Sequence, residues 1–113
     1  MTRRLAALPL LLLASAAVAQ APPAPAVQQR LAALSSRLGQ CHHGVVLRLA
    51  RTPLTPAQIA DRAMTACASR EAPIRAYLVQ QIGPQRANAV MQTQRAHWRE
   101  VVGRLVLQTR FSH

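Results

Sequence analysis

Apolar residues recur along the first half of the chain at intervals of three and four. The positions are Val27, Leu31, Leu34, Leu38, Cys41 and Val45. This spacing places them on one face of an α-helix, whereas a half-buried strand alternates with a period of two. Gly39 and Gly44 each weaken a helix by about 1 kcal/mol relative to alanine, but the pattern keeps its phase through both. It predicts one helix over residues 27–50, with a break near Gly39 as the alternative.

A second helix is predicted directly after Pro53, which ends the first. Thr55 and Gln58 have the spacing of a capping box, in which each side chain binds the backbone amide of the other. Pro56 falls at the first helical position, where its missing N–H costs nothing. The second helix is expected over 56–70. Its inward positions at intervals of four are Ile59, Ala63 and Cys67.

Two further helices are predicted in the second half of the chain. The third begins near Pro73 and stops at Gly83, a glycine cap followed by a proline. The last is expected to be the longest, with Phe111 packing at its end. The inward positions of the third helix are Ile74, Tyr77 and Leu78. Those of the last are Ala87, Met91, Gln94, Trp98, Val101 and Leu105, with Val90, Val102 and Val106 widening the apolar face.

Composition supports an all-α fold. The chain has 113 residues, half of them hydrophobic, but only three aromatic residues and four glycines. Strand-rich proteins favour aromatic and β-branched residues, whereas alanine, leucine, glutamine and arginine, which dominate here, are good helix formers. The sequence therefore predicts a small bundle of about four helices in a single domain over 27–113.

The first nineteen residues have the layout of a secretory signal. Two arginines precede an uncharged apolar stretch, Leu5 to Ala19, which ends in the small-x-small sequence Ala-Val-Ala. A transmembrane anchor is the alternative, but it needs about 20 apolar residues. We expect a signal peptide over 1–19, cleavage near Ala19, and a periplasmic or secreted product. The proline-rich residues 20–26 are expected to form an extended spacer.

The two cysteines are expected to form a disulfide bond. If 27–50 and 56–70 form an antiparallel hairpin that turns at Leu54, Cys41 and Cys67 lie thirteen residues either side of the turn and face each other. An oxidising destination and a small core favour such a bond. The alternative is a redox-active pair, which usually has the closer spacing C-x-x-C.

The histidines raise the question of a metal site beside Cys41. Consecutive residues on a helix point about 100° apart, so His42 and His43 are poorly placed to share one ion. We therefore expect His42, His43 and His97 to be solvated or packed side chains, with a metal site as the weaker alternative. No cofactor is predicted.

Arginine dominates the charge of the chain. There are 14 arginines, no lysine and three acidic residues, which gives a formal charge of +11, or +9 without residues 1–19. Such a protein is drawn to phosphorylated lipids, acidic wall polymers or acidic proteins, since guanidinium groups bind carboxylate and phosphate in a forked geometry. The candidate anion-binding residues are Arg30, Arg37, Arg51, Arg86, Arg95 and Arg99. A merely solvated basic surface is the alternative.

The sequence favours a binding protein over an enzyme. The three acidic residues are scattered, no serine lies in a nucleophile motif, and there is no glycine-rich phosphate loop. Non-enzymatic binding to an anionic envelope component or an acidic protein, with peripheral membrane contact, is the leading hypothesis. Export and the lack of interleaved aromatic residues argue against nucleic acid. An unrecognised enzyme or a metal carrier is a further alternative, and the pattern favours no particular oligomeric state.

Residues 54–58, Leu-Thr-Pro-Ala-Gln, resemble the LTxxQ signature of small, basic, helical periplasmic proteins. That family of stress-induced chaperones and metal-stress sensors includes Spy and CpxP, whose members typically carry a second copy of the signature; this chain has one. The resemblance implies a chaperone-like stress protein that holds unfolded chains between basic and apolar surfaces. This is the second functional hypothesis.

Overall fold

The computed structural model describes residues 24–112, which form four α-helices and the short segments between them. The helices are α2 (Pro25–Leu49), α3 (Pro56–Ala66), α4 (Ala68–Ile82) and α5 (Pro84–Phe111). The predicted all-α bundle of about four helices is confirmed. The predicted signal peptide, 1–19, lies outside the described residues. The first helix begins at Pro25, inside the predicted spacer.

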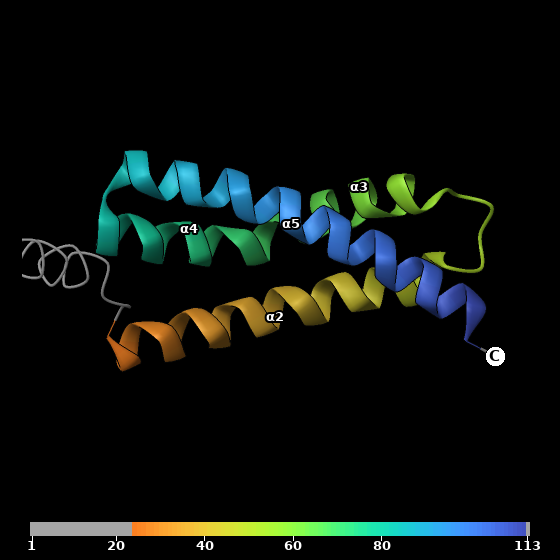
Figure 1. The fold of residues 1–113 in the computed structure, drawn as a ribbon, viewed down its shortest axis with the longest axis horizontal. Helices are drawn as coiled ribbons and strands as arrows, with labels where there is room; N and C mark the ends of the chain where they lie inside the picture. Colours follow the sequence, from red (N-terminus) through yellow and green to blue (C-terminus); the bar gives the residue numbers. More distant parts are fainter. Residues whose placement is uncertain (1–23, 113) are drawn as a thin grey trace, which may run out of the picture.

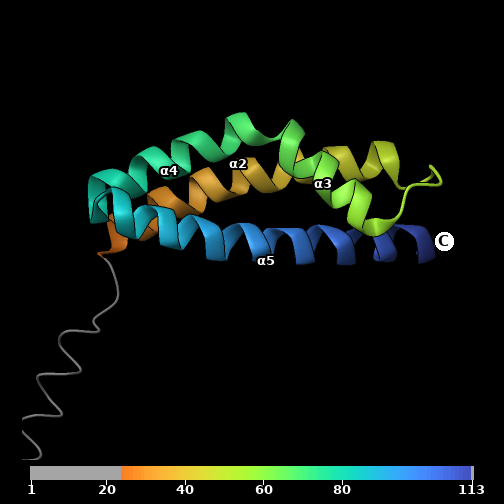
Figure 2. The same ribbon diagram turned by 90° about the horizontal axis from the view of Figure 1, so that it is seen from above.

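The four helices pack side by side in one elongated bundle (Figures 1 and 2). Helices α2 and α5 each run along most of its length. Helices α3 and α4 follow one another along the remaining side, and we call this pair the α3–α4 rod. The α4–α5 hairpin lies at the end where α2 begins, and the loop from α2 to α3 lies at the end where α5 finishes. Within 24–112, no helix combines the length and apolar character needed to cross a bilayer.

Every helix contributes apolar side chains to one continuous core. Burial of each large side chain contributes about 1.5–3 kcal/mol. The largest fully buried ones are Leu38 and Val46 from α2, Ile59 from α3, Met91, Val102 and Val106 from α5, and Cys67 between α3 and α4. The core therefore lies where α2, α5 and the α3–α4 rod meet.

Two of the predicted helix ends are confirmed in detail. The Thr55 hydroxyl accepts a hydrogen bond from the Gln58 amide at 3.1 Å, and the Thr55 amide donates to the Gln58 side chain at 2.9 Å. Gly83 has a φ of +83°, a left-handed conformation that glycine adopts without strain. It ends α4 and allows α5 to begin at Pro84.

The predicted disulfide bond is also confirmed. Cys41 and Cys67 are bonded, with their Cα atoms 5.9 Å apart. Cys41 is half-buried on α2, whereas Cys67 is fully buried at the junction of α3 and α4. The bond thus fixes the register between α2 and the α3–α4 rod.

The boundary between the second and third helices differs from the prediction. The second helix was expected over 56–70 and the third from Pro73, but the chain bends at Cys67, which has φ −102° and ψ 13°. The Arg70 amide then bonds the Cys67 carbonyl at 2.9 Å, and α4 starts at Ala68. Pro73 lies inside α4, where its missing N–H removes one hydrogen bond, to the carbonyl of the exposed Ser69.

The buried face of α5 also departs from the prediction. Gln94 and Val101 are exposed, whereas Val102 and Val106, expected only to widen the apolar face, are completely buried. A repeat that alternates steps of four and three drifts by about 20° per heptad against a straight helix, so the predicted line leaves the core toward its end. Trp98 is half-buried and packs against the core. The expected packing of Phe111 is wrong, because its side chain is 81% exposed.

The loop between α2 and α3 is held by an arginine from the end of α5. Arg110 Nε donates to the Ala50 carbonyl at 2.8 Å, and its Nη2 atom donates to the carbonyls of Thr52, at 3.0 Å, and Leu54. The Thr52 hydroxyl bonds the Leu49 carbonyl at 2.6 Å. The bonds to Leu49 and Ala50 satisfy carbonyl groups at the end of α2. Those to Thr52 and Leu54 satisfy carbonyl groups of the loop itself.

Candidate anion-binding site

The six arginines predicted to bind anions are all exposed but do not form one group. They are Arg30, Arg37, Arg51, Arg86, Arg95 and Arg99. Arg30 and Arg86 lie in the first two turns of α2 and α5, whereas Arg51 follows the end of α2. Arg37 shares a hollow with Arg70, Arg51 with Arg110, and Arg95 with Arg75. The structure therefore divides the predicted set among several parts of the molecule.

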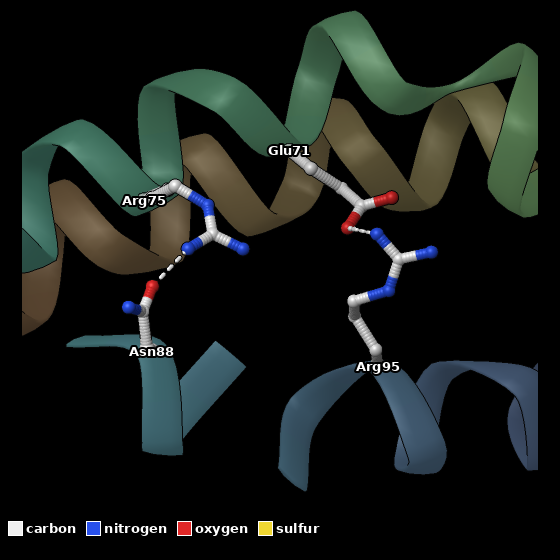
Figure 3. Close-up of polar contacts among 4 residues, drawn as sticks. All are labelled: Glu71, Arg75, Asn88 and Arg95. Carbon is white, nitrogen blue, oxygen red and sulfur yellow. Dashed lines mark hydrogen bonds and ion pairs between the residues drawn. The ribbon is translucent and has the colours of Figure 1, made fainter. Parts of the chain in front are cut away.

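Two of these arginines form ion pairs between helices of the bundle. Arg95 Nη1 lies 3.0 Å from Glu71 Oε1, which joins α5 to α4 (Figure 3). The Glu71 side chain is only 6% exposed, whereas that of Arg95 is 46% exposed. Arg99 pairs with Asp61 on α3, and both of these side chains are more than half exposed. Arg95 and Arg99 thus have a structural role.

A second polar contact between α4 and α5 lies next to the Glu71–Arg95 pair. Arg75 reaches from α4 to the side-chain oxygen of Asn88 on α5, and both contacts are seen in Figure 3. A hollow of about 490 Å³ lies between the two contacts, with Met91 and Val79 in its lining. These polar groups already bind one another across the hairpin.

Four arginines, Arg37 among them, line two hollows between α2 and the α3–α4 rod. Arg37 and Arg70 line a hollow of about 460 Å³ together with Gln40 and Cys41. Arg48 and Arg62 line a hollow of about 570 Å³, whose lining also includes Val45. We call Arg37, Arg48, Arg62 and Arg70 the basic seam. Sequence reasoning included only Arg37 of these four.

The disulfide bond explains why these four arginines lie in two pairs, one on each side of it. Arg37 lies four residues before Cys41, and Arg70 lies three residues after Cys67. Because the two chain directions are opposite, both arginines fall on the same side of the bond. Arg48 and Arg62 fall on the other side by the same argument. Eleven residues of helix separate Arg37 from Arg48, or about 16 Å at 1.5 Å per residue.

No arginine of the basic seam forms an ion pair with an acidic side chain of residues 24–112. The ion pairs in that range are Glu71–Arg95 and Asp61–Arg99. Asp61 lines the larger hollow, but Arg99 holds its carboxylate. An anion in the groove would relieve the repulsion between like charges and accept charge-assisted hydrogen bonds from the guanidinium groups.

The three histidines of the described region lie in different surroundings. His42 is buried, and burial lowers the pKa of its imidazole below the ordinary value of 6.5. His43 and His97 are exposed. Among residues 24–112, no three histidine, cysteine or acidic side chains converge as a metal-binding group.

The comparisons with known proteins leave the geometry as the basis for a function. No family model, curated protein or solved structure matches this chain.

The basic seam could have been found from the sequence. Once Cys41 is paired with Cys67, counting outward along both helices places Arg37 near Arg70 and Arg48 near Arg62.

Proposed function

We propose that this chain is an exported, non-enzymatic binding protein that attaches to phosphate groups of an anionic envelope component through its basic seam. One observation carries the proposal: four arginines without acidic partners in 24–112 line two hollows on either side of the Cys41–Cys67 bond. The planar, forked guanidinium group of an arginine can bind two oxygens of one phosphate group at once.

The electrostatics of the whole chain support this proposal. Without residues 1–19, the formal charge is +9, which attracts the protein toward a negative surface before any specific contact forms. Each arginine that reaches an anionic surface contributes about 1 kcal/mol at physiological salt. Four arginines on one groove can therefore act together, whereas arginines on different faces cannot all reach the same surface.

Export is part of the proposal and rests on two features. The residues before the described region have the three-part layout of a secretory signal. A disulfide bond between the chain's two cysteines suits an oxidising compartment such as the periplasm. Lipid phosphates and phosphorylated wall polymers are both present outside the cytoplasm, and both offer the same chemistry.

The proposal is tested by vesicle binding with two variants of equal charge. The first, R37Q/R48Q/R62Q/R70Q, removes the basic seam. The second, R30Q/R51Q/R86Q/R104Q, removes four exposed arginines elsewhere and so loses the same charge. Binding to phosphatidylglycerol vesicles is expected to weaken by more than about 100-fold in the first variant, from about 1 kcal/mol per arginine, and much less in the second.

Two controls complete the test. Phosphatidylcholine vesicles are expected to bind neither the wild type nor the variants, and added salt is expected to weaken binding to phosphatidylglycerol. Isolated wall fragments, measured in parallel, distinguish a polymer from a lipid as the preferred source of phosphate. Equal losses in the two variants would refute a specific role for the seam.

Exposed apolar side chains favour the chaperone-like function as the second candidate. Leu47, Leu107 and Phe111 are exposed on the two long helices. Apolar groups beside arginines offer contacts for an unfolded, acidic chain. Suppressed aggregation of a denatured client at equal molar amounts, lost in L47Q/L107Q/F111Q but retained without the seam arginines, would favour this candidate over the first.

A further inference from the structure

The arginines of the basic seam lie along the bundle in two separate pairs. Arg37 and Arg48 are both on α2, eleven residues apart. Eleven residues make about three helical turns, so both arginines lie on one face of α2, about 16 Å apart along its axis. On the other side of the groove, Arg70 shares a hollow with Arg37, and Arg62 shares one with Arg48. The seam therefore offers positive charge at two points along one line.

The two hollows offer similar chemistry. Besides its arginine pair, each is lined by one neutral side chain that can donate a hydrogen bond, Gln40 beside Arg37 and Thr65 beside Arg62. Asp61 also borders the second hollow, but its carboxylate pairs with Arg99. Each hollow can thus bind a phosphate group through forked guanidinium contacts and one further donor.

Small residues separate the two arginine pairs. Gly44 follows Arg37 by seven residues and precedes Arg48 by four, so it lies on the same face of α2. A Cβ atom placed on Gly44 would meet no other atom within 4 Å. Across the groove, Ala66 is exposed and lies four residues from each arginine of the α3–α4 rod. These two positions leave room for a chain of phosphate groups to pass from one pair to the other.

We propose that the basic seam binds a linear polyanion, a polymer with phosphate groups along its length, which lies in the groove parallel to α2 and contacts both arginine pairs. This inference rests on the proposed function and names the class of anion. One phosphate group cannot contact both pairs, because about 16 Å of helix separates them. A single chain can enter a groove between helices along its length, whereas the broad surface of a bilayer remains outside it.

Contact with both pairs at once makes binding depend on the length of the polyanion. Once one pair is occupied, the second contact is intramolecular, and it strengthens binding only if the chain is long enough to span the two pairs. A short polyanion gains nothing from the second pair beyond a second place to bind. The dependence on length therefore distinguishes a spanning polymer from phosphate groups that bind one by one.

The test compares inorganic triphosphate, which is too short to reach both pairs, with long-chain polyphosphate. Two variants each remove one arginine pair, and a third removes the same charge from exposed positions elsewhere. They are R37Q/R70Q, R48Q/R62Q and the control R30Q/R86Q. All six side chains are exposed and form no ion pair in 24–112, so the variants are expected to fold.

Calorimetric titration of the full protein measures the Kd of each polyanion. In the wild type, the Kd is expected to be at least about tenfold lower for the long chain than for triphosphate. Both pair variants are expected to lose most of this preference, because a single remaining pair cannot be spanned. The control variant is expected to retain it, although its lower charge weakens the binding of both polyanions.

Equal affinity for the two polyanions in the wild type would overturn the spanning polymer, as would a preference that changes alike in all three variants. If either occurs while binding to phosphatidylglycerol vesicles still depends on the seam, the proposed function stands and a bilayer is the better partner. If the two four-arginine variants lose vesicle binding equally, the proposed function itself fails.

Discussion

Arg95 on α5 holds the buried carboxylate of Glu71 on α4, with 3.0 Å between Nη1 and Oε1 (Figure 3). The second carboxylate oxygen, Oε2, is buried and has no hydrogen-bond partner in 24–112. A charged group removed from water depends on its ionic partner, because the lost hydration is not otherwise replaced. The charge on Glu71 is therefore compensated chiefly by this one arginine.

The variant R95Q is expected to destabilise the protein by about 2 kcal/mol. Loss of one partner from a fully buried ion pair costs about 3–5 kcal/mol, and exposure of the Arg95 guanidinium reduces this value. The matched variant R99Q is expected to lose less than about 1 kcal/mol, since its pair with Asp61 is exposed. Urea denaturation of both variants measures the difference. Equal losses would contradict a special dependence of Glu71 on Arg95.

Sequence reasoning assigned Arg95 and Arg99 to an anion-binding surface, although their positions also suit contacts between helices. They follow Met91 by four and eight residues, so they continue a core-facing line of α5. A charged residue on such a line is consistent with an ion pair across the bundle. The partners, Glu71 and Asp61, lie on elements whose packing the sequence pattern alone did not define.

The Cys41–Cys67 bond is expected to contribute about 3.5 kcal/mol, the chain-entropy value for a loop of roughly 26 residues. The variant C41S/C67S is expected to melt more than about 10 °C below the oxidised wild type, from about 4–8 °C per kcal/mol for a domain of this size. Calorimetry in oxidising buffer measures this shift. A reductant is expected to lower the melting temperature of the wild type and leave the variant unchanged. If the reductant has no effect on the wild type, the bond does not stabilise the fold.

Burial of His42 predicts a dependence of stability on pH. The pKa of His42 in the folded chain lies below the ordinary 6.5. As the pH falls through 6.5, the unfolded chain binds a proton that the folded chain does not. The free energy of unfolding is therefore expected to decrease as the pH falls from about 7 toward the folded pKa, and to stay level above about pH 7.

The variant H42L is expected to remove this decrease, whereas H43L, at the neighbouring exposed position, is expected to retain it. Urea denaturation across this pH range provides the measurement. A decrease of equal size in both variants would assign the effect to other groups.

Arg110 is predicted to hold the α2–α3 loop against the end of α5. It donates to three carbonyl oxygens, those of Ala50, Thr52 and Leu54. The variant R110K keeps the charge but loses the planar fork, so it is expected to destabilise the protein by about 1–2 kcal/mol. Hydrogen exchange of amides in 50–55 is expected to accelerate. Unchanged exchange there would show that the loop is held by other contacts.

Features that depend on local chemistry could be predicted from the sequence. The capping box at Thr55, the stop at Gly83 and the apolar face of α2 each involve residues within a few positions of one another. The bend at Cys67 was not predicted, because no glycine or proline marks it and the apolar spacing of four runs up to Cys67. Pro73 was the stronger local signal, but α4 continues through it without the hydrogen bond from residue 73 to the Ser69 carbonyl.

The candidate site was predicted only in part, because the predicted pairing of the cysteines was not used to group the arginines. The charge of the chain indicated anion binding, and Arg37 belongs to the basic seam. Arg48, Arg62 and Arg70 were not selected, because exposure and charge do not distinguish one surface arginine from another. What brings them together is the register between α2 and the α3–α4 rod, which the disulfide bond fixes.

The most direct test of the basic seam is an NMR titration of the assigned arginine Nε–Hε signals with short-chain phosphatidylglycerol. The account predicts that the signals of Arg37, Arg48, Arg62 and Arg70 shift together and saturate, while those of Arg30, Arg86 and Arg104 shift much less. Equal shifts in both sets, or saturation of the second set alone, would contradict it.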